Sequence, residues 1–130
     1  MNQRTTLVLA SLYGTLAVAF GAFGAHALKA TLTVTGRSET FELAVRYHFY
    51  HALALLAIGI LMEKFPKLKT SSWLFSSGII IFSGSLYTLS LTNQAWWGAV
   101  TPFGGVLLIA GWAALGLTLI ERQKKITAAD

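Results

Sequence analysis

The sequence predicts an all-α integral membrane protein, a single domain over residues 1–130 built as a bundle of four transmembrane helices. Of its 130 residues, 55% are hydrophobic and only 12% are charged, too few polar groups to cover a water-soluble domain of this size. Apolar residues gather in four runs, at about 7–28, 44–62, 73–91 and 103–120. Each run is close to the ~20 residues with which a helix crosses the hydrocarbon. They lack the period-two alternation of barrel strands, which favours helices.

The first run carries small residues at steps of three or four, including Gly14, Ala17 and Gly21. Residues at this spacing share one helix face, and small side chains let two helix backbones approach closely. We therefore expect a packing seam within the bundle or between subunits. An Ala-x-Ala pattern at 25–27 also resembles a secretory cleavage site, but the length of the run and the three runs that follow favour a transmembrane helix.

The second run is predicted to begin as a helix in the outer interface, ahead of the hydrocarbon. Ser38 and Glu39 supply an N-cap type of residue followed by an acid in the first turn. Glu42 and Arg46 are spaced for an i,i+4 ion pair. The outer loop, 29–43, alternates threonine with leucine and valine over part of its length. This alternation indicates a short extended or interfacial segment.

The third and fourth runs hold mainly small and hydroxyl residues as their polar groups, which is usual for helix contacts. Thr101 and Pro102 mark the start of the fourth helix, where proline costs no hydrogen bond. Trp112 falls near the middle of this helix, away from either interface. We expect Trp112 to pack between helices.

The basic residues predict the orientation. Of the ten Lys+Arg, seven lie before the first run, between the second and third, or after the fourth. Only Lys29, Arg37 and Arg46 lie toward the other side. The positive-inside rule then places both termini in the cytoplasm and the chain in the cytoplasmic (inner) membrane. The uneven distribution of Lys and Arg thus accounts for the net positive charge as a signal of membrane orientation. We therefore expect no nucleic-acid partner, and we expect the lipid bilayer to surround the helices.

The candidate site is a polar cluster on the outer side, made of His26, His51, His48, Tyr47 and Arg46. Ionisable groups in membrane spans are costly, so they are functional candidates by default. His26 continues a row of small and hydroxyl residues on the first helix, which predicts that it faces protein. His48 and His51 are spaced i,i+3, and all three histidines are expected at a similar depth.

Three roles compete for this cluster. Neutral imidazoles could hold a metal ion or haem, although the chain has no cysteine to assist them. A proton-responsive or anion-contacting site is chemically allowed, because histidine titrates near neutral pH and Arg46 stays charged. The third role is a hydrogen-bonded network that joins the first two helices, which we favour. We accordingly expect no metal, no cofactor and no catalytic residue.

Four ordered motifs resemble a known family. Residues 21–28 read GAFGAHAL, residues 47–56 YHFYHALALL, residues 82–87 FSGSLY, and residues 101–105 TPFGG, followed by Gly111-Trp112. Together they are similar to the small bacterial membrane proteins known as domain of unknown function 423, related to transmembrane protein 256 of animals. The resemblance covers essentially the whole chain and implies four membrane helices. The family pattern includes His26 and His51, and it implies no chemistry.

The leading functional hypothesis is a non-enzymatic interaction, assembly or envelope-associated component, either as a homo-oligomer or with another membrane protein. An alternative is an oligomeric transporter or channel for ions or small solutes, with the histidines at its outer mouth. Proton-coupled exporters usually need an embedded carboxylate, and every acid here lies outside the four runs. A second alternative is a haem- or metal-binding accessory protein that uses the histidine cluster.

Overall fold

The computed structural model describes the backbone of residues 1–127 and the side chains of residues 1–121. Four long helices dominate it, and each is long and apolar enough to cross a membrane. They are α1 (Gln3–Ala25), α3 (Ser38–Leu61), α4 (Lys69–Thr92) and α5 (Thr101–Thr127). Shorter elements connect them: α2 (Lys29–Val34), and the 3-10 helices η1 (Pro66–Leu68) and η2 (Ala95–Ala99). The predicted all-α class with four membrane helices is confirmed for the described residues.

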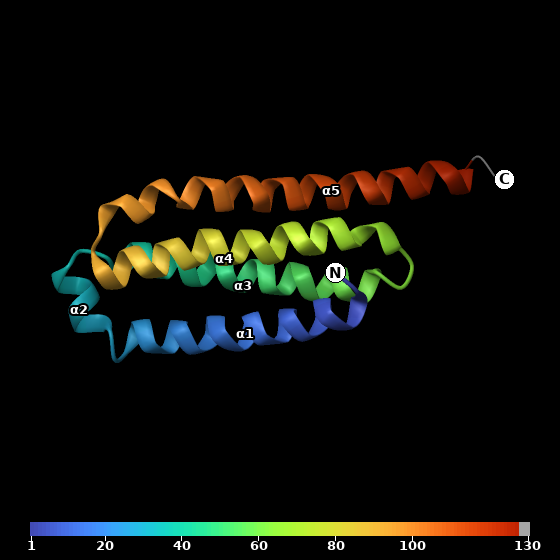
Figure 1. The fold of residues 1–130 in the computed structure, drawn as a ribbon. Helices are drawn as coiled ribbons and strands as arrows, with labels where there is room; N and C mark the ends of the chain where they lie inside the picture. Colours follow the sequence, from blue (N-terminus) through green and yellow to red (C-terminus); the bar gives the residue numbers. More distant parts are fainter. Residues whose placement is uncertain (128–130) are drawn as a thin grey trace.

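The four long helices pack side by side in the order α1, α3, α4, α5, so each mainly contacts its neighbour along the chain. Figure 1 shows α1 and α5 at opposite edges, with α3 and α4 between them. The apolar core accordingly lies on the two central helices and includes Leu55, Ile58 and Phe75, all fully buried. The two edge helices are each covered mainly from one side.

One end of the molecule holds the N-terminus, η1 and the C-terminal end of α5, and the other end holds α2 and the α4–α5 connection. Most helices extend beyond the apolar runs, because polar interfacial residues continue the same hydrogen-bonded backbone. At the start of α1, for example, the Asn2 side chain accepts a hydrogen bond from the Thr5 N–H at 2.8 Å, which caps the helix.

The structure differs from the sequence prediction after residue 25. The first helix ends at Ala25, three residues short of the predicted end at 28, and His26 caps it outside helical geometry. The chain then turns into the helix α2, where alternation had suggested a short extended or interfacial segment, so the extended alternative is wrong. Leu32 supplies the physical reason, because it is buried at the junction of α2 with its neighbours and anchors a helical turn there.

At Gly104 the backbone of α5 lies directly against the backbone of α4. A Cβ added to Gly104 would lie 2.3 Å from the backbone nitrogen of Phe82 on α4, closer than any real side chain tolerates. Gly78 of α4 receives a side chain of α5, since a Cβ there would lie 2.5 Å from Leu108 Cδ2. Glycine therefore permits α4 and α5 to touch backbone to backbone, the packing that drives helix association in lipid.

Candidate functional site: a polar network inside the helices

His51 lies halfway along α3 and is hydrogen-bonded at both ring nitrogens. The Trp112 indole N–H on α5 donates to His51 Nε2 at 3.2 Å. His51 Nδ1 lies 2.8 Å from the carbonyl oxygen of Tyr47. An indole nitrogen can only donate and a carbonyl oxygen can only accept, so the ring is the neutral tautomer protonated at Nδ1. The side chain is 6% exposed, and its hydrogen-bonding capacity is used within the chain.

Aromatic rings enclose the same imidazole. The centroid of the Phe75 ring on α4 lies 5.4 Å from that of His51, and the Trp112 ring lies 6.2 Å away in an edge-on arrangement. Tyr47 stacks on the third side at 5.9 Å. His51 therefore connects α3, α4 and α5 through ring contacts in addition to its hydrogen bonds.

His48 lies one turn earlier on α3 and faces α1 and α4. Its Nδ1 is 3.3 Å from the Tyr87 hydroxyl, while Tyr13 and Phe20 of α1 contact its ring with centroids 5.7 Å and 6.4 Å away. The side chain is 4% exposed, and its Nε2 is buried with no hydrogen-bond partner among the described residues. A buried polar atom without a partner is costly, so one ring nitrogen of His48 is the unsatisfied position of this network.

Two hydroxyl pairs continue the network between α1 and α4. The Thr6 and Ser72 hydroxyls lie 2.8 Å apart, and the Tyr13 hydroxyl lies 2.9 Å from that of Ser76. Both pairs are buried. Thr6 and Tyr13 were not among the residues predicted for this site. The one sequence signal that bears on them is general: hydroxyl groups in membrane spans tend to contact other helices.

His26 does not join the network, and the prediction that it faces protein is wrong. It is exposed at the turn between α1 and α2, whereas His48 and His51 lie halfway along α3. Ser11 and Thr15, which belong to the row of residues that pointed to His26, are themselves exposed, because α1 presents a different face to α3. The three histidines therefore do not share one depth, and only His48 and His51 are buried together.

Tyr47 and Arg46 are neighbours on α3, but only Tyr47 contacts the buried histidines. Tyr47 contributes its backbone carbonyl to His51 and packs its ring on Phe82, with centroids 4.7 Å apart. Arg46 is exposed, and the expected ion pair with Glu42 does not form. Both charged side chains instead line an open pocket beside α1 and α2. Arg46 is thus separate from the histidines.

The small residues of α1 line its contact with α3. Ala17 is 1% exposed, and a Cβ added to Gly21 would lie 3.3 Å from Val45 Cγ1 on α3. Gly14 differs from these two residues, because no atom outside its own helix lies within 4 Å of the position of a Cβ. The seam therefore places Ala17 and Gly21 against α3 and leaves Gly14 beside a shallow groove.

The arrangement at His51 is suited to joining helices. Its Nε2 lone pair accepts from Trp112, so that atom has no lone pair left to offer a metal ion while this bond holds. Among the described residues, no group of three or more His, Cys, Asp or Glu side chains is placed to hold a metal ion.

Comparison with known families agrees with the sequence motifs. The family described as "Protein of unknown function (DUF423)" matches residues 20–105. This stretch contains the end of α1, α2, all of α3 and α4, and the start of α5. It therefore includes His48, His51 and Gly104.

Curated relatives cover nearly the whole chain. It is 46% identical over 114 residues to a UPF0382 membrane protein of Staphylococcus saprophyticus, covering 87% of this chain and 94% of that protein. It is 37% identical over 122 residues to the UPF0382 membrane protein YwdK of Bacillus subtilis, covering 92% and 98%. It is 35% identical over 131 residues to the UPF0382 inner membrane protein YgdD of Escherichia coli, covering 96% of each. No solved structure matches the chain.

Proposed function

Since this chain belongs to the DUF423 family, whose relatives are called membrane proteins, we propose that it is a non-enzymatic component of the cytoplasmic (inner) membrane that acts by associating with other membrane helices. The name of the relative YgdD, an inner membrane protein, supports this location. The first partner that we propose is a second copy of the chain.

The hydrogen bonding of His51 carries the non-enzymatic part of the proposal. General acid–base and metal chemistry both need a ring nitrogen that can reach a substrate or ion. Here one nitrogen is occupied by Trp112 and the other by the Tyr47 carbonyl. The bond from Trp112 joins α5 to α3, so this buried histidine has a structural role that requires no reaction.

The uncovered side of α5 is the surface that we propose for association. Ile109 and Ala113 are exposed there, and around Gly116 no atom outside the helix lies within 4 Å of the position of a Cβ. These residues follow one another at steps of three or four and form one face. A second copy would bring the same face, which suits a two-fold symmetric contact in which small residues allow close approach.

Disulfide cross-linking tests this association directly, because the chain has no cysteine of its own. The variant Ile109→Cys in liposomes at low protein density is expected to form a covalent dimer on oxidation. Ile80→Cys on α4 is the matched control, since Ile80 and Ile109 are 60% and 71% exposed. Equal cross-linking at both positions would indicate random collision and contradict the proposed face.

We also propose that both termini lie in the cytoplasm, supported by the seven basic residues that belong to their side of the sequence. Gln3→Cys and Gln94→Cys place the same substitution at exposed positions of opposite ends. A membrane-impermeant maleimide added to intact spheroplasts should label Gln94→Cys, and Gln3→Cys only after permeabilisation. The reverse labelling pattern would invert the orientation.

A further inference from the structure

A continuous groove follows the contact between α1 and α3 on the surface of the molecule. At the end near α2 it opens into a pocket of about 540 Å³ that includes Gly21, Val45 and Arg46 in its lining. The same three residues line the next cavity, of about 270 Å³. That cavity in turn shares Val18 and Phe49 with a third, of about 440 Å³. The three cavities therefore form one path from the α2 end toward the middle of the helices.

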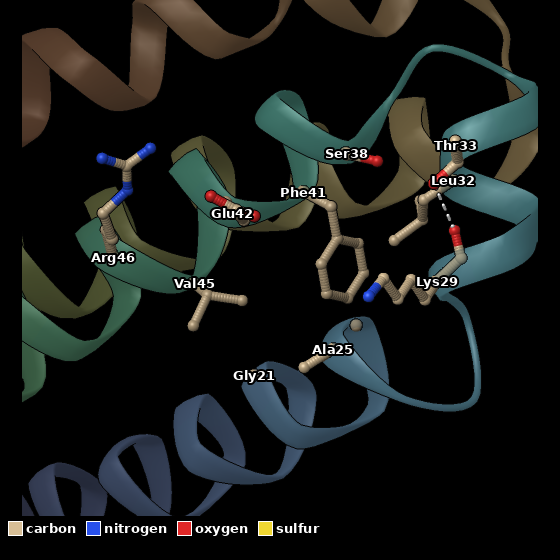
Figure 2. Close-up of a pocket in the computed structure, with 11 residues that line it drawn as sticks. Gly21, Ala25, Lys29, Leu32, Thr33, Ser38, Phe41, Glu42, Val45 and Arg46 are labelled. Atoms are coloured by element: carbon tan, nitrogen blue, oxygen red, sulfur yellow. Dashed lines mark hydrogen bonds between the residues drawn. The ribbon is translucent and has the colours of Figure 1, made fainter.

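The polarity of this path changes along its length. Figure 2 shows the wide pocket at the α2 end, with Lys29 reaching over it from α2, and Glu42 and Arg46 placed along α3. Gly21 and Gly24 of α1 also line this pocket, and Val45 and Phe41 of α3 pack close to them. The third cavity is lined mainly by apolar groups, and Leu53 and Leu56 are the residues of α3 at its far end. The groove thus has a charged mouth and an apolar continuation.

The charges at the mouth have no side-chain partners among the described residues. Neither Arg46 nor Glu42 forms a side-chain ion pair or hydrogen bond with any described residue, and the same holds for the Lys29 amine. Arg46 lies about two turns inside α3. A charged side chain at this position in a membrane helix needs a counter-ion, water or a headgroup within reach.

We propose that this groove binds one aminophospholipid of the phosphatidylethanolamine type. Lys29 and Arg46 would contact the phosphate, and the Glu42 carboxylate would accept hydrogen bonds from the headgroup ammonium. One acyl chain would lie along the apolar continuation, past Val18 and Phe49. Two cations and one carboxylate around one pocket complement a headgroup that carries both signs of charge, and the volume of the mouth lies within the usual range of ligand sites.

The test is native mass spectrometry of the delipidated full-length protein, titrated with dioleoyl phosphatidylethanolamine or with dioleoyl phosphatidylglycerol. The chain should bind one phosphatidylethanolamine and prefer it over phosphatidylglycerol. Arg46→Gln and Lys29→Gln should each weaken phosphatidylethanolamine binding about tenfold, since each removes a charge-assisted hydrogen bond. Glu42→Gln should abolish the preference between the two lipids.

Matched controls separate the pocket from general surface charge. Arg37→Gln and Glu39→Gln remove charges at the same end of the molecule from residues that do not line the pocket, and they should leave lipid affinity unchanged. Val18→Trp fills the apolar path at an exposed position. It should weaken both lipids while the helical circular dichroism and melting temperature stay at the wild-type values.

Tighter or equal binding of phosphatidylglycerol would overturn the proposal, as would equal losses in the pocket and control variants. No residue of this groove lies on α5. The cross-linking experiment at Ile109 and the lipid titrations with the Arg46 variant therefore test separate surfaces. A negative result in one of them does not affect the interpretation of the other.

Discussion

Replacing Gly104 by alanine is expected to destabilise the protein by about 3 kcal/mol, at the upper end for overpacking. The new methyl group would meet the backbone of α4, with the Phe82 nitrogen at 2.3 Å and its Cα at 2.6 Å. A backbone cannot rotate out of the way as a side chain can, so α4 and α5 must separate. Reversible unfolding in mixed detergent micelles, followed by tryptophan fluorescence, measures the free energy of unfolding.

The neighbouring residue provides the control for this prediction. A Cβ added to Gly105 would lie 3.7 Å from the Phe82 ring, which is an ordinary contact. Gly105→Ala changes the same chemistry in the same helix turn and should shift the free energy of unfolding by no more than about 0.5 kcal/mol. If the two variants unfolded alike, the close approach of α4 and α5 at Gly104 would be incorrect.

The second large effect is expected at His51. His51→Phe keeps a ring in the aromatic surroundings but removes the acceptor for the Trp112 N–H and the donor to the Tyr47 carbonyl. We expect a loss of about 1 to 2 kcal/mol in the free energy of unfolding, the usual range for buried hydrogen bonds. The same detergent unfolding experiment measures it.

Two further variants show whether the loss comes from the contact itself. His26→Phe changes an exposed histidine and should leave stability within about 0.5 kcal/mol of wild type. Trp112→Phe removes the donor, so the double variant with His51→Phe should lose less than the sum of the two single losses. Strict additivity would mean that His51 and Trp112 do not act as a pair.

The sequence predicted the class of protein and its helices because hydropathy is a local property. Four apolar runs were enough to predict four membrane helices, and the motifs around Tyr47 and Thr101 were enough to identify the family. Both predictions are confirmed. The helix ends were predicted unevenly. The start of α3 near Ser38 was predicted from its local sequence, whereas α1 begins at Gln3, ahead of its apolar run, because interfacial residues continue a helix without adding apolar character.

The polar site was predicted only in part. Spacing placed His48 and His51 one turn apart on one helix, which depends on local geometry alone. His26 was grouped with them by an assumed face of α1, and the actual rotation of that helix exposes it. Thr6 and Tyr13 were not predicted, because their partners lie on another helix and no local pattern marks the pairing.

The sequence by itself therefore determined that this is a four-helix membrane protein with few charges in its spans. Each run must be apolar and must form its own backbone hydrogen bonds within the hydrocarbon, whatever the other runs do. Only the tertiary structure decided which polar atoms meet. His51 and Trp112 are 61 residues apart in the chain, and their contact depends on how α3 and α5 are rotated and packed. The groove between α1 and α3 has the same origin, because residues of α1, α2 and α3 together line its wide pocket, with Arg46 and Glu42 among them.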